Sequence, residues 1–162
     1  MNIQETIKYI YEPCKLTCTQ PVIDKNCIDY LGCSLKINNQ HVIFRVAKTT
    51  PTKFGQFVTL WKRVNNSLPL PFHIDDYIDF CVVNVSKGSE VGQFVFSKSV
   101  LVKHGVLASK NTKGKCAFRV YHPWDIVTST QAIRTQKWQL NYFHSFDLEK
   151  SLDIKRILSL YS

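Results

Sequence analysis

Residues 30–48, YLGCSLKINNQHVIFRVAK, contain the pattern that decides the fold. Two runs rich in β-branched and other apolar residues, 30–37 and 41–48, flank the dipeptide Asn38-Asn39. Asparagine tolerates the left-handed backbone conformation that a tight hairpin turn requires. The stretch therefore predicts two antiparallel strands joined by a short turn.

Further strands and helices are predicted on both sides of this hairpin. Aromatic and β-branched residues gather between turn signals at four more places, which predicts strands at residues 56–62, 77–85, 91–96 and 117–121. Apolar residues at helical spacing predict helices at residues 2–11, 98–103, 128–143 and 154–161. The chain of 162 residues suits one hydrophobic core. We expect a single α+β domain with a mostly antiparallel or mixed sheet of about six strands and flanking helices.

The charge of the chain favours an anionic partner. There are 21 Lys and Arg against 12 Asp and Glu, a formal net charge of +9. Six basic residues and no acidic residue lie between Asp29 and Asp75, and eight basic residues with only Asp125 lie between Glu90 and Gln139. If these two segments are neighbours, they form a positive face. The alternative is a solvated surface whose charge serves solubility.

Cysteine spacing and hydropathy favour a cytoplasmic protein with reduced thiols. The pairs Cys14/Cys18 and Cys27/Cys33 lack the tight spacing of a zinc site. Residues 1–11 lack the apolar run of a secretory signal, and no stretch approaches the roughly 20 apolar residues of a membrane span. The sequence predicts no metal, no cofactor and no membrane partner.

Four stretches resemble the MepB family of small bacterial proteins. They are FRVAKTTPTKFGQFVTLWKR (44–63), GQFVF (92–96), RVYHPWD (119–125) and QKWQLNYF (136–143). The blocks have the order and similar spacing of the family, and the resemblance covers about residues 27–143. It implies one MepB-like domain over residues 1–162, with 144–162 as a C-terminal helical extension. Ser97 and His122 stand where many relatives have proline.

The resemblance to this family does not imply a particular reaction. MepB proteins have no assigned biochemical activity, so no catalytic residue is transferred to this chain. Function is therefore argued from the residues themselves.

The loop Lys48-Thr-Thr-Pro-Thr-Lys53 is a candidate phosphate site. Two ammonium groups and three threonine hydroxyls stand within six residues, flanked by Arg45 and Gln56. Ammonium groups, hydroxyls and backbone N–H groups all donate to phosphate oxygens. The spacing differs from that of a Walker loop. The alternative is a solvent-facing loop in which threonines close local turns.

The predicted helix over residues 128–143 is a second candidate for binding. Arg134 and Trp138 are four residues apart and can meet, with Lys137 beside them. Single-strand binders combine such cations with aromatic rings that stack on bases. The alternative places Trp138 in the core. The predicted binding residues are Arg45, Lys48, Thr50, Thr52, Lys53, Gln56, Arg119, Arg134, Lys137 and Trp138.

Catalytic patterns are weaker than these binding patterns. Asp75, Asp76 and Asp79 form the densest acidic cluster, but the acid-x-Lys element of a metal-dependent nuclease occurs only at Asp153-Ile-Lys155, in the predicted tail helix. Cys81 lies in an apolar strand, and no serine nucleophile motif is present. The sequence favours a non-catalytic domain that binds nucleic acid or another polyanion. The alternatives are a metal-dependent nuclease or phosphohydrolase, and an interaction module for an acidic protein.

Overall fold

The hairpin at Asn38-Asn39 is present in the computed structural model, which describes residues 1–147 and 149–162. Its strands are β2 (Cys33–Ile37) and β3 (Gln40–Val46), paired antiparallel. Both asparagines have positive φ angles, 48° and 66°, as expected for the left-handed conformation. The predicted hairpin is confirmed.

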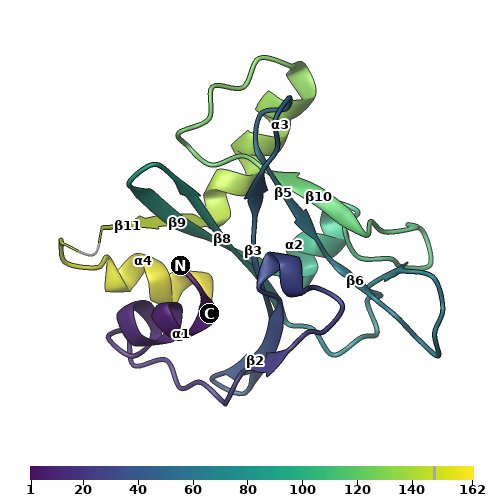
Figure 1. Cartoon of the computed structure of the whole chain (residues 1–162), viewed down its shortest axis with the longest axis horizontal. Helices are drawn as coiled ribbons and strands as arrows, with labels where there is room; N and C mark the ends of the chain where they lie inside the picture. The colour runs from purple at the N-terminus through teal and green to yellow at the C-terminus, as the bar shows by residue number, and fades with distance from the viewer. Residues whose placement is uncertain (148) are drawn as a thin grey trace.

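The hairpin lies inside a six-stranded mixed sheet (Figure 1). The strand order is β1-β2-β3-β8-β9-β11, in which β3 and β8 run parallel and the other neighbours run antiparallel. The additional strands are β1 (Val22–Ile23), β8 (Phe80–Lys87), β9 (Glu90–Ser97) and β11 (Phe143–Phe146). The expected α+β fold with a mixed sheet is confirmed.

Strand β11 corrects the predicted end of the helix over residues 128–143. In the structure this segment is α3 (Thr130–Gln139) followed by a 3-10 turn (Leu140–Tyr142). The chain then becomes β11, with Phe143 opposite Phe94 of β9. Apolar residues three apart at the end of a helix look the same in sequence whether the helix continues or a strand begins. A purely helical extension from residue 144 is therefore wrong for residues 144–146.

Two smaller sheets extend from the main one. The three-stranded sheet has the order β10-β5-β4, and β6 pairs with β7. Their strands are β4 (Lys48–Thr49), β5 (Gln56–Thr59), β6 (Trp61–Lys62), β7 (Leu70–Pro71) and β10 (Ala117–Val120). The pairing of β5 with β10 makes the two basic segments of the sequence spatial neighbours.

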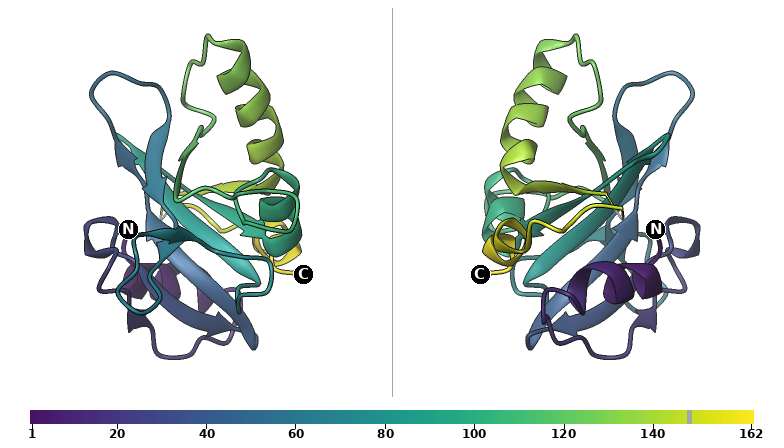
Figure 2. Two further views of the ribbon diagram at one scale, coloured as in Figure 1. Left: turned by 90° about the vertical axis from the view of Figure 1, so that its right-hand side faces the viewer. Right: turned by 90° about the vertical axis from the view of Figure 1, so that its left-hand side faces the viewer.

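Helices cover both faces of the main sheet and divide the core in two (Figures 1 and 2). On one face lie α1 (Ile3–Thr6), its continuation as a π-helical turn (Ile7–Tyr11), and α4 (Ile154–Leu160). On the other lie α2 (Lys98–Lys103), α3 and the three-stranded sheet. Successive side chains of a strand point to opposite faces, so Phe44 joins the first core and Ile43 the second. The predicted helices at both termini and after Ser97 are confirmed.

A buried polar network joins both ends of the chain to the sheet. The Tyr161 hydroxyl donates to Gln93 Oε1 at 2.9 Å and lies 2.8 Å from the Tyr11 hydroxyl. Gln93 also contacts His144 Nε2 at 3.2 Å and donates to Asn84 Oδ1 at 2.7 Å. Buried polar groups are costly unless they are hydrogen-bonded, so this network selects one arrangement of the terminal segments.

All six cysteines are free thiols. Burial raises the pKa of Cys81 to about 12 and that of Cys33 to about 11, so both side chains are protonated at neutral pH. Within the described part of the chain, no helix has the length and apolar character needed to cross a membrane.

Candidate polyanion-binding groove

A groove of about 550 Å³ lies between the β4–β5 loop and helix α3. Loop and helix project from the same end of the molecule and face one another (Figure 2). Loop residues 52–54 form one wall, and α3 together with the segment before it, from residue 128 onward, forms the other. Residues 117–119 of β10 lie between the two walls. The loop and the helix, which the sequence offered as two separate candidate sites, therefore line one concave surface.

Strand pairing explains why the two walls meet. Strand β5 follows the loop and pairs antiparallel with β10, with Gln56 opposite Val120 and Thr59 opposite Ala117. The chain leaves β10 at residue 120 and reaches α3 ten residues later. Gln139 of α3 then binds back to β10, since its amide donates to the Arg119 carbonyl at 2.9 Å and accepts from the Tyr121 N–H at 2.8 Å.

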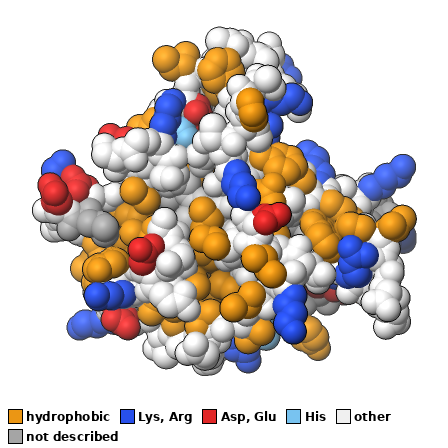
Figure 3. Space-filling view, viewed as in Figure 1, with side chains coloured by type: hydrophobic (Ala, Val, Ile, Leu, Met, Phe, Trp, Pro, Cys, Tyr) orange, Lys and Arg blue, Asp and Glu red, His pale blue; other side chains and the backbone are white. Residues whose placement is uncertain are grey.

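The groove is positive because its cations lack carboxylate partners. Lys53, Lys115 and Arg119 line it, and no Asp or Glu is among the described lining residues. Across the described residues, none of these three side chains forms an ion pair. On the face of the molecule drawn in Figure 3, Lys and Arg side chains also outnumber acidic side chains over the right-hand part. Unpaired cations in a concave site focus a positive potential that attracts anions.

Arg119 holds the loop in place as well as adding charge. Its guanidinium donates to Thr50 Oγ1 at 2.8 Å and to the carbonyls of Gly55 at 3.3 Å and Phe54 at 3.4 Å. The same group lies over the ring of Phe57, 5.7 Å from its centroid. Thr50 and Arg119 therefore contribute through the shape of the loop, while Thr52 and Lys53 face the groove.

Gly55 permits the close approach of the loop to Tyr121, the residue that follows β10. Its φ angle is +75°, and a Cβ there would stand 2.7 Å from the ring of Tyr121. Any other residue would be strained in its backbone and would clash with that ring. The glycine thus allows the loop to pack directly against residue 121.

Arg45 is not a surface residue, which corrects its predicted place on the binding face. Its side chain is 1 % exposed and forms an ion pair with Asp24 at 2.7 Å. Its remaining donors bind the carbonyls of Phe44 at 3.0 Å and Thr59 at 3.2 Å. A guanidinium with all its nitrogens engaged inside the protein cannot meet a ligand phosphate. Through its ion pair and hydrogen bonds, Arg45 instead stabilises the packing of residues 24–32 and of β5 against the central hairpin.

Gln56 and Lys48 also lie outside the groove. The Gln56 side chain is buried, and its amide donates to Thr49 Oγ1 at 3.0 Å and to the Ser86 carbonyl at 2.8 Å. Lys48 is exposed, and its ammonium group lies over the ring of Tyr30, 5.0 Å from the centroid. Of the two lysines of the candidate phosphate loop, only Lys53 lines the groove, so the groove does not bring Lys48 and Lys53 together.

Trp138 lies at the border between the groove and the core, the two positions weighed for it in the sequence. It lines the groove, but its ring is stacked on His104 with centroids 3.7 Å apart and planes inclined by 6°. It also packs against the buried Phe96 at 5.5 Å. Arg134 and Lys137 are exposed on α3 beside the groove without lining it. They add charge at its rim.

The acidic cluster at residues 75–79 caps turns. Asp76 forms an ion pair with Lys62 and accepts the His73 N–H at 2.7 Å, and Asp79 accepts the His41 N–H at 2.7 Å. Burial opposes ionisation of Asp76, but these hydrogen bonds outweigh it and lower the pKa of the carboxyl. Among the described residues, no group of three or more His, Cys, Asp or Glu side chains is placed to hold a metal ion.

Sequence reasoning missed several groove residues. His104 and Lys115 line the groove, as do the aromatic residues Phe54 and Tyr121. Lys115 was one of many lysines in a basic segment, and His104 stands in the cap that ends α2. No motif around either residue in the sequence indicates ligand binding. The groove is assembled from segments far apart in the chain, so local patterns do not reveal its lining.

Comparisons with known proteins agree on one family. A family model described as MepB-like matches residues 24–145. A solved structure titled "Crystal Structure of MepB" superposes with a TM-score of 0.78 at 32 % identity, covering 90 % of this chain and 97 % of that chain. A search of curated proteins found no match.

Proposed function

The chain belongs to the MepB-like family, and we propose that it binds nucleic acid or another polyanion in the groove between the β4–β5 loop and α3. One observation carries the proposal: three cations line the groove with no carboxylate among the described lining residues. Phosphate neutralisation by lysine and arginine supplies most of the affinity of sequence-independent nucleic-acid binding. In this proposal the protein acts by binding rather than by catalysis.

The polar lining supports the same proposal. Threonine and glutamine side chains from both walls accompany the cations, among them Thr52, Gln131 and Thr135. Hydroxyl and amide groups donate to phosphate oxygens and to base edges. A volume of about 550 Å³ is within the range of sites that enclose one small ligand or one segment of a larger one.

The proposed setting is the cytoplasm of a bacterium. The six free thiols support a reducing compartment. An anionic polymer in that compartment carries phosphates along its whole length, so it offers the groove more than one point of attachment.

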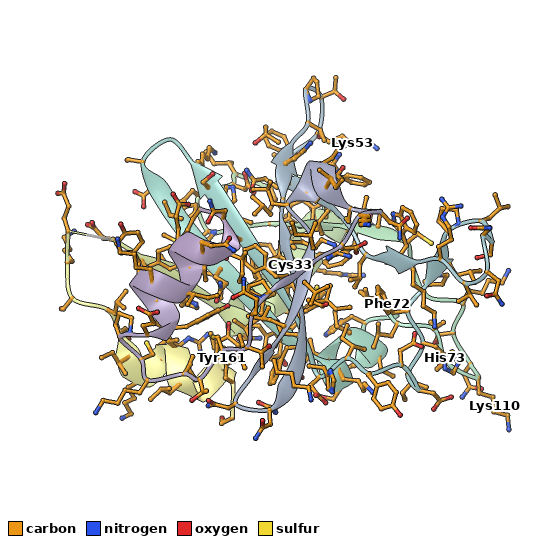
Figure 4. The ribbon with its side chains drawn as sticks, turned by 60° about the horizontal axis from the view of Figure 1, so that its bottom comes forward. Cys33, Lys53, Phe72, His73, Lys110 and Tyr161 are labelled. Carbon is orange, nitrogen blue, oxygen red and sulfur yellow. The ribbon has the colours of Figure 1, made fainter. Side chains whose placement is uncertain are left out.

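The test compares two pairs of lysines. Lys53→Ala with Lys115→Ala removes two groove charges, whereas Lys110→Ala with Lys113→Ala removes two exposed charges that do not line the groove. Figure 4 shows Lys53 and Lys110 at widely separated ends of the molecule. Binding of a fluorescein-labelled oligonucleotide is measured by fluorescence anisotropy, with circular dichroism to check folding.

Charge-assisted hydrogen bonds are worth about 1.5–3 kcal/mol each, and screened surface charges at most about 1 kcal/mol. The Lys53/Lys115 variant should therefore lose at least about tenfold in affinity, and the Lys110/Lys113 variant only a few-fold. Equal losses from the two variants would assign binding to diffuse surface charge. Absence of binding by the unmodified protein at low salt would reject the proposed function.

A further inference from the structure

An uncharged hollow of about 380 Å³ lies beside β1, away from the groove. Its lining residues come from the stretches 2–4, 20–23 and 28–33, and it shares none of them with the groove. We propose that this hollow is a self-association surface, at which two copies of the chain dock as a two-fold symmetric dimer. The inference goes beyond the proposed function and does not depend on it.

Large apolar side chains are exposed around this hollow. Within ten consecutive residues, four such side chains are each more than half exposed, namely Val22, Ile23, Ile28 and Leu31. The last three line the hollow. Figure 3 shows hydrophobic side chains gathered over the middle of the same face of the molecule. A group of exposed apolar side chains on one face is typical of an interaction site.

The backbone holds Leu31 in a conformation that leucine avoids. Leu31 follows a 3-10 turn (Ile28–Tyr30) and has a φ angle of +46°, in the left-handed region that suits glycine and asparagine. The turn is fixed by the Gly32 N–H, which donates to the Cys27 carbonyl at 2.9 Å. A half-exposed leucine at such a position contributes little to the fold of one copy. Burial against a second copy gives this side chain a role.

The distribution of charge permits two copies to meet at this face. The chain carries a formal net charge of +9, so two copies repel one another over most of their surfaces. Residues 1–31 are the exception, with three lysines and four acidic residues, whereas the rest of the chain has 18 basic and 8 acidic residues. No charged residue is among the described residues that line the hollow. Contact at this face therefore avoids the repulsion that opposes contact elsewhere.

The shape of this face is complementary to itself. Ile23 is 71 % exposed and stands between this hollow and a second one of about 620 Å³, since it lines both. A two-fold axis between a projecting side chain and an adjacent hollow inserts the projection of each copy into the hollow of the other. The aliphatic side chains of both copies are then removed from water. Because the patch is small, we expect a reversible dimer with a Kd of about 1–100 µM.

The proposed dimer leaves the polyanion groove of each copy accessible. In Figure 2 the β4–β5 loop and α3 rise at the top of the molecule, whereas the N-terminus lies lower down. Ionic strength separates the two kinds of contact. Salt screens the repulsion between two positive copies and strengthens an apolar dimer, but it weakens the binding of a polyanion.

The experiment measures sedimentation velocity of the full chain at concentrations from below to above the expected Kd. The protein is first freed of nucleic acid by nuclease treatment and chromatography at high salt. The variants are Ile23→Lys and Leu31→Asn. The matched control is Leu68→Lys, which adds the same charge at a side chain that is 82 % exposed and lies outside both hollows.

The unmodified protein and Leu68→Lys should dimerise with similar Kd values, which should fall as salt rises. Ile23→Lys should raise the Kd at least about tenfold, because it would bury a charge in an uncharged hollow. Leu31→Asn should also raise the Kd, while the melting temperature stays equal or rises because asparagine tolerates the left-handed backbone. This second variant decides if Ile23→Lys misfolds. Hydrogen exchange of residues 20–33 should slow as the protein concentration increases.

Three results would overturn the inference. They are a monomer at every concentration, equal weakening by Ile23→Lys and Leu68→Lys, and an association that salt or nuclease abolishes. The third result would mean that nucleic acid bridges the copies and that this surface takes no part. Anisotropy with a short oligonucleotide tests the proposed function separately. Below the Kd of the dimer, Ile23→Lys should bind the oligonucleotide as the unmodified protein does.

Discussion

Arg45 and Lys53 show how two basic residues of one segment take opposite places in this molecule. In sequence Arg45 is one of six basic residues in a segment without acids. In the structure it is buried and paired with Asp24, whereas Lys53 from the same segment is exposed in the groove. Asp24 lies just before the acid-free segment begins, so charge counting within that segment could not reveal the pair.

Replacing Arg45 should destabilise the fold. Breaking a buried ion pair by removing one partner costs about 3–5 kcal/mol, and because Asp24 is partly exposed we expect Arg45→Met to lose about 3 kcal/mol of unfolding free energy. Urea denaturation followed by circular dichroism measures the loss. The exposed Arg134→Met is the control and should stay within about 0.5 kcal/mol of the unmodified protein. Similar values for the two variants would contradict the structural role of Arg45.

A comparison of Gly55 with Gly88 distinguishes the stability cost of backbone strain from that of a steric clash. Both have positive φ, +75° and +60°, but a Cβ at Gly88 meets nothing within 4 Å and one at Gly55 meets Tyr121 at 2.7 Å. Each glycine-to-alanine change costs roughly 1 kcal/mol for the backbone. We expect Gly55→Ala to cost at least about 1 kcal/mol more than Gly88→Ala, measured by urea denaturation. An equal cost would show that the loop can move away from Tyr121.

At the scale of elements, β11 is the strand that determines the environment of His144. The strand occupies the edge of the main sheet next to β9, and His144 is buried there against Gln93. Burial, helped by Arg156, lowers the pKa of His144 from 6.5 to about 4. The folded protein therefore prefers this imidazole neutral.

Stability should fall as the pH is lowered from 6.5 towards 4. In this window the unfolded chain binds a proton at His144 and the folded chain does not, so acid favours unfolding by up to about 3 kcal/mol. His144→Asn should lose less stability than the unmodified protein between pH 7 and pH 4 in urea titrations. Between pH 7 and pH 8 the two proteins should change in parallel. Identical losses in acid would exclude His144 as the source.

At the scale of the whole molecule, strand pairing brings together two basic segments that are far apart in the sequence. The β5–β10 pair brings the segment between Asp29 and Asp75 next to the segment between Glu90 and Gln139. Three of the basic residues behind the net charge of +9 line one groove, and within the described part of the chain none of the three forms an ion pair.

Binding of a single-stranded oligonucleotide should weaken as salt rises. Each phosphate neutralised contributes about −0.7 to the slope of log affinity against log salt concentration, so three groove cations predict a slope of about −2. Lys53→Ala with Lys115→Ala should flatten this slope by about 1.4. Anisotropy titrations at several salt concentrations measure both slopes. A slope near zero for the unmodified protein would contradict phosphate binding.

The sequence by itself determined the local elements and the family. The asparagine turn between 30–37 and 41–48, the Ser97 cap of α2 and the apolar spacing of the terminal helices are short-range patterns, and each was confirmed. Among the groove residues, sequence reasoning identified Thr52, Lys53, Arg119 and Trp138. These stand in or beside elements whose positions local patterns predict.

Only the tertiary structure decided which side chains face the groove. Arg45 and Gln56 are buried, Lys48 lies over Tyr30, and His104 and Lys115 enter from segments that carried no signal. A strand reverses the direction of its side chains at every residue, so a basic residue faces core or solvent according to the sheet that it joins. That choice depends on pairing between residues far apart in the chain, such as β5 with β10 and β11 with β9, which local sequence patterns do not encode.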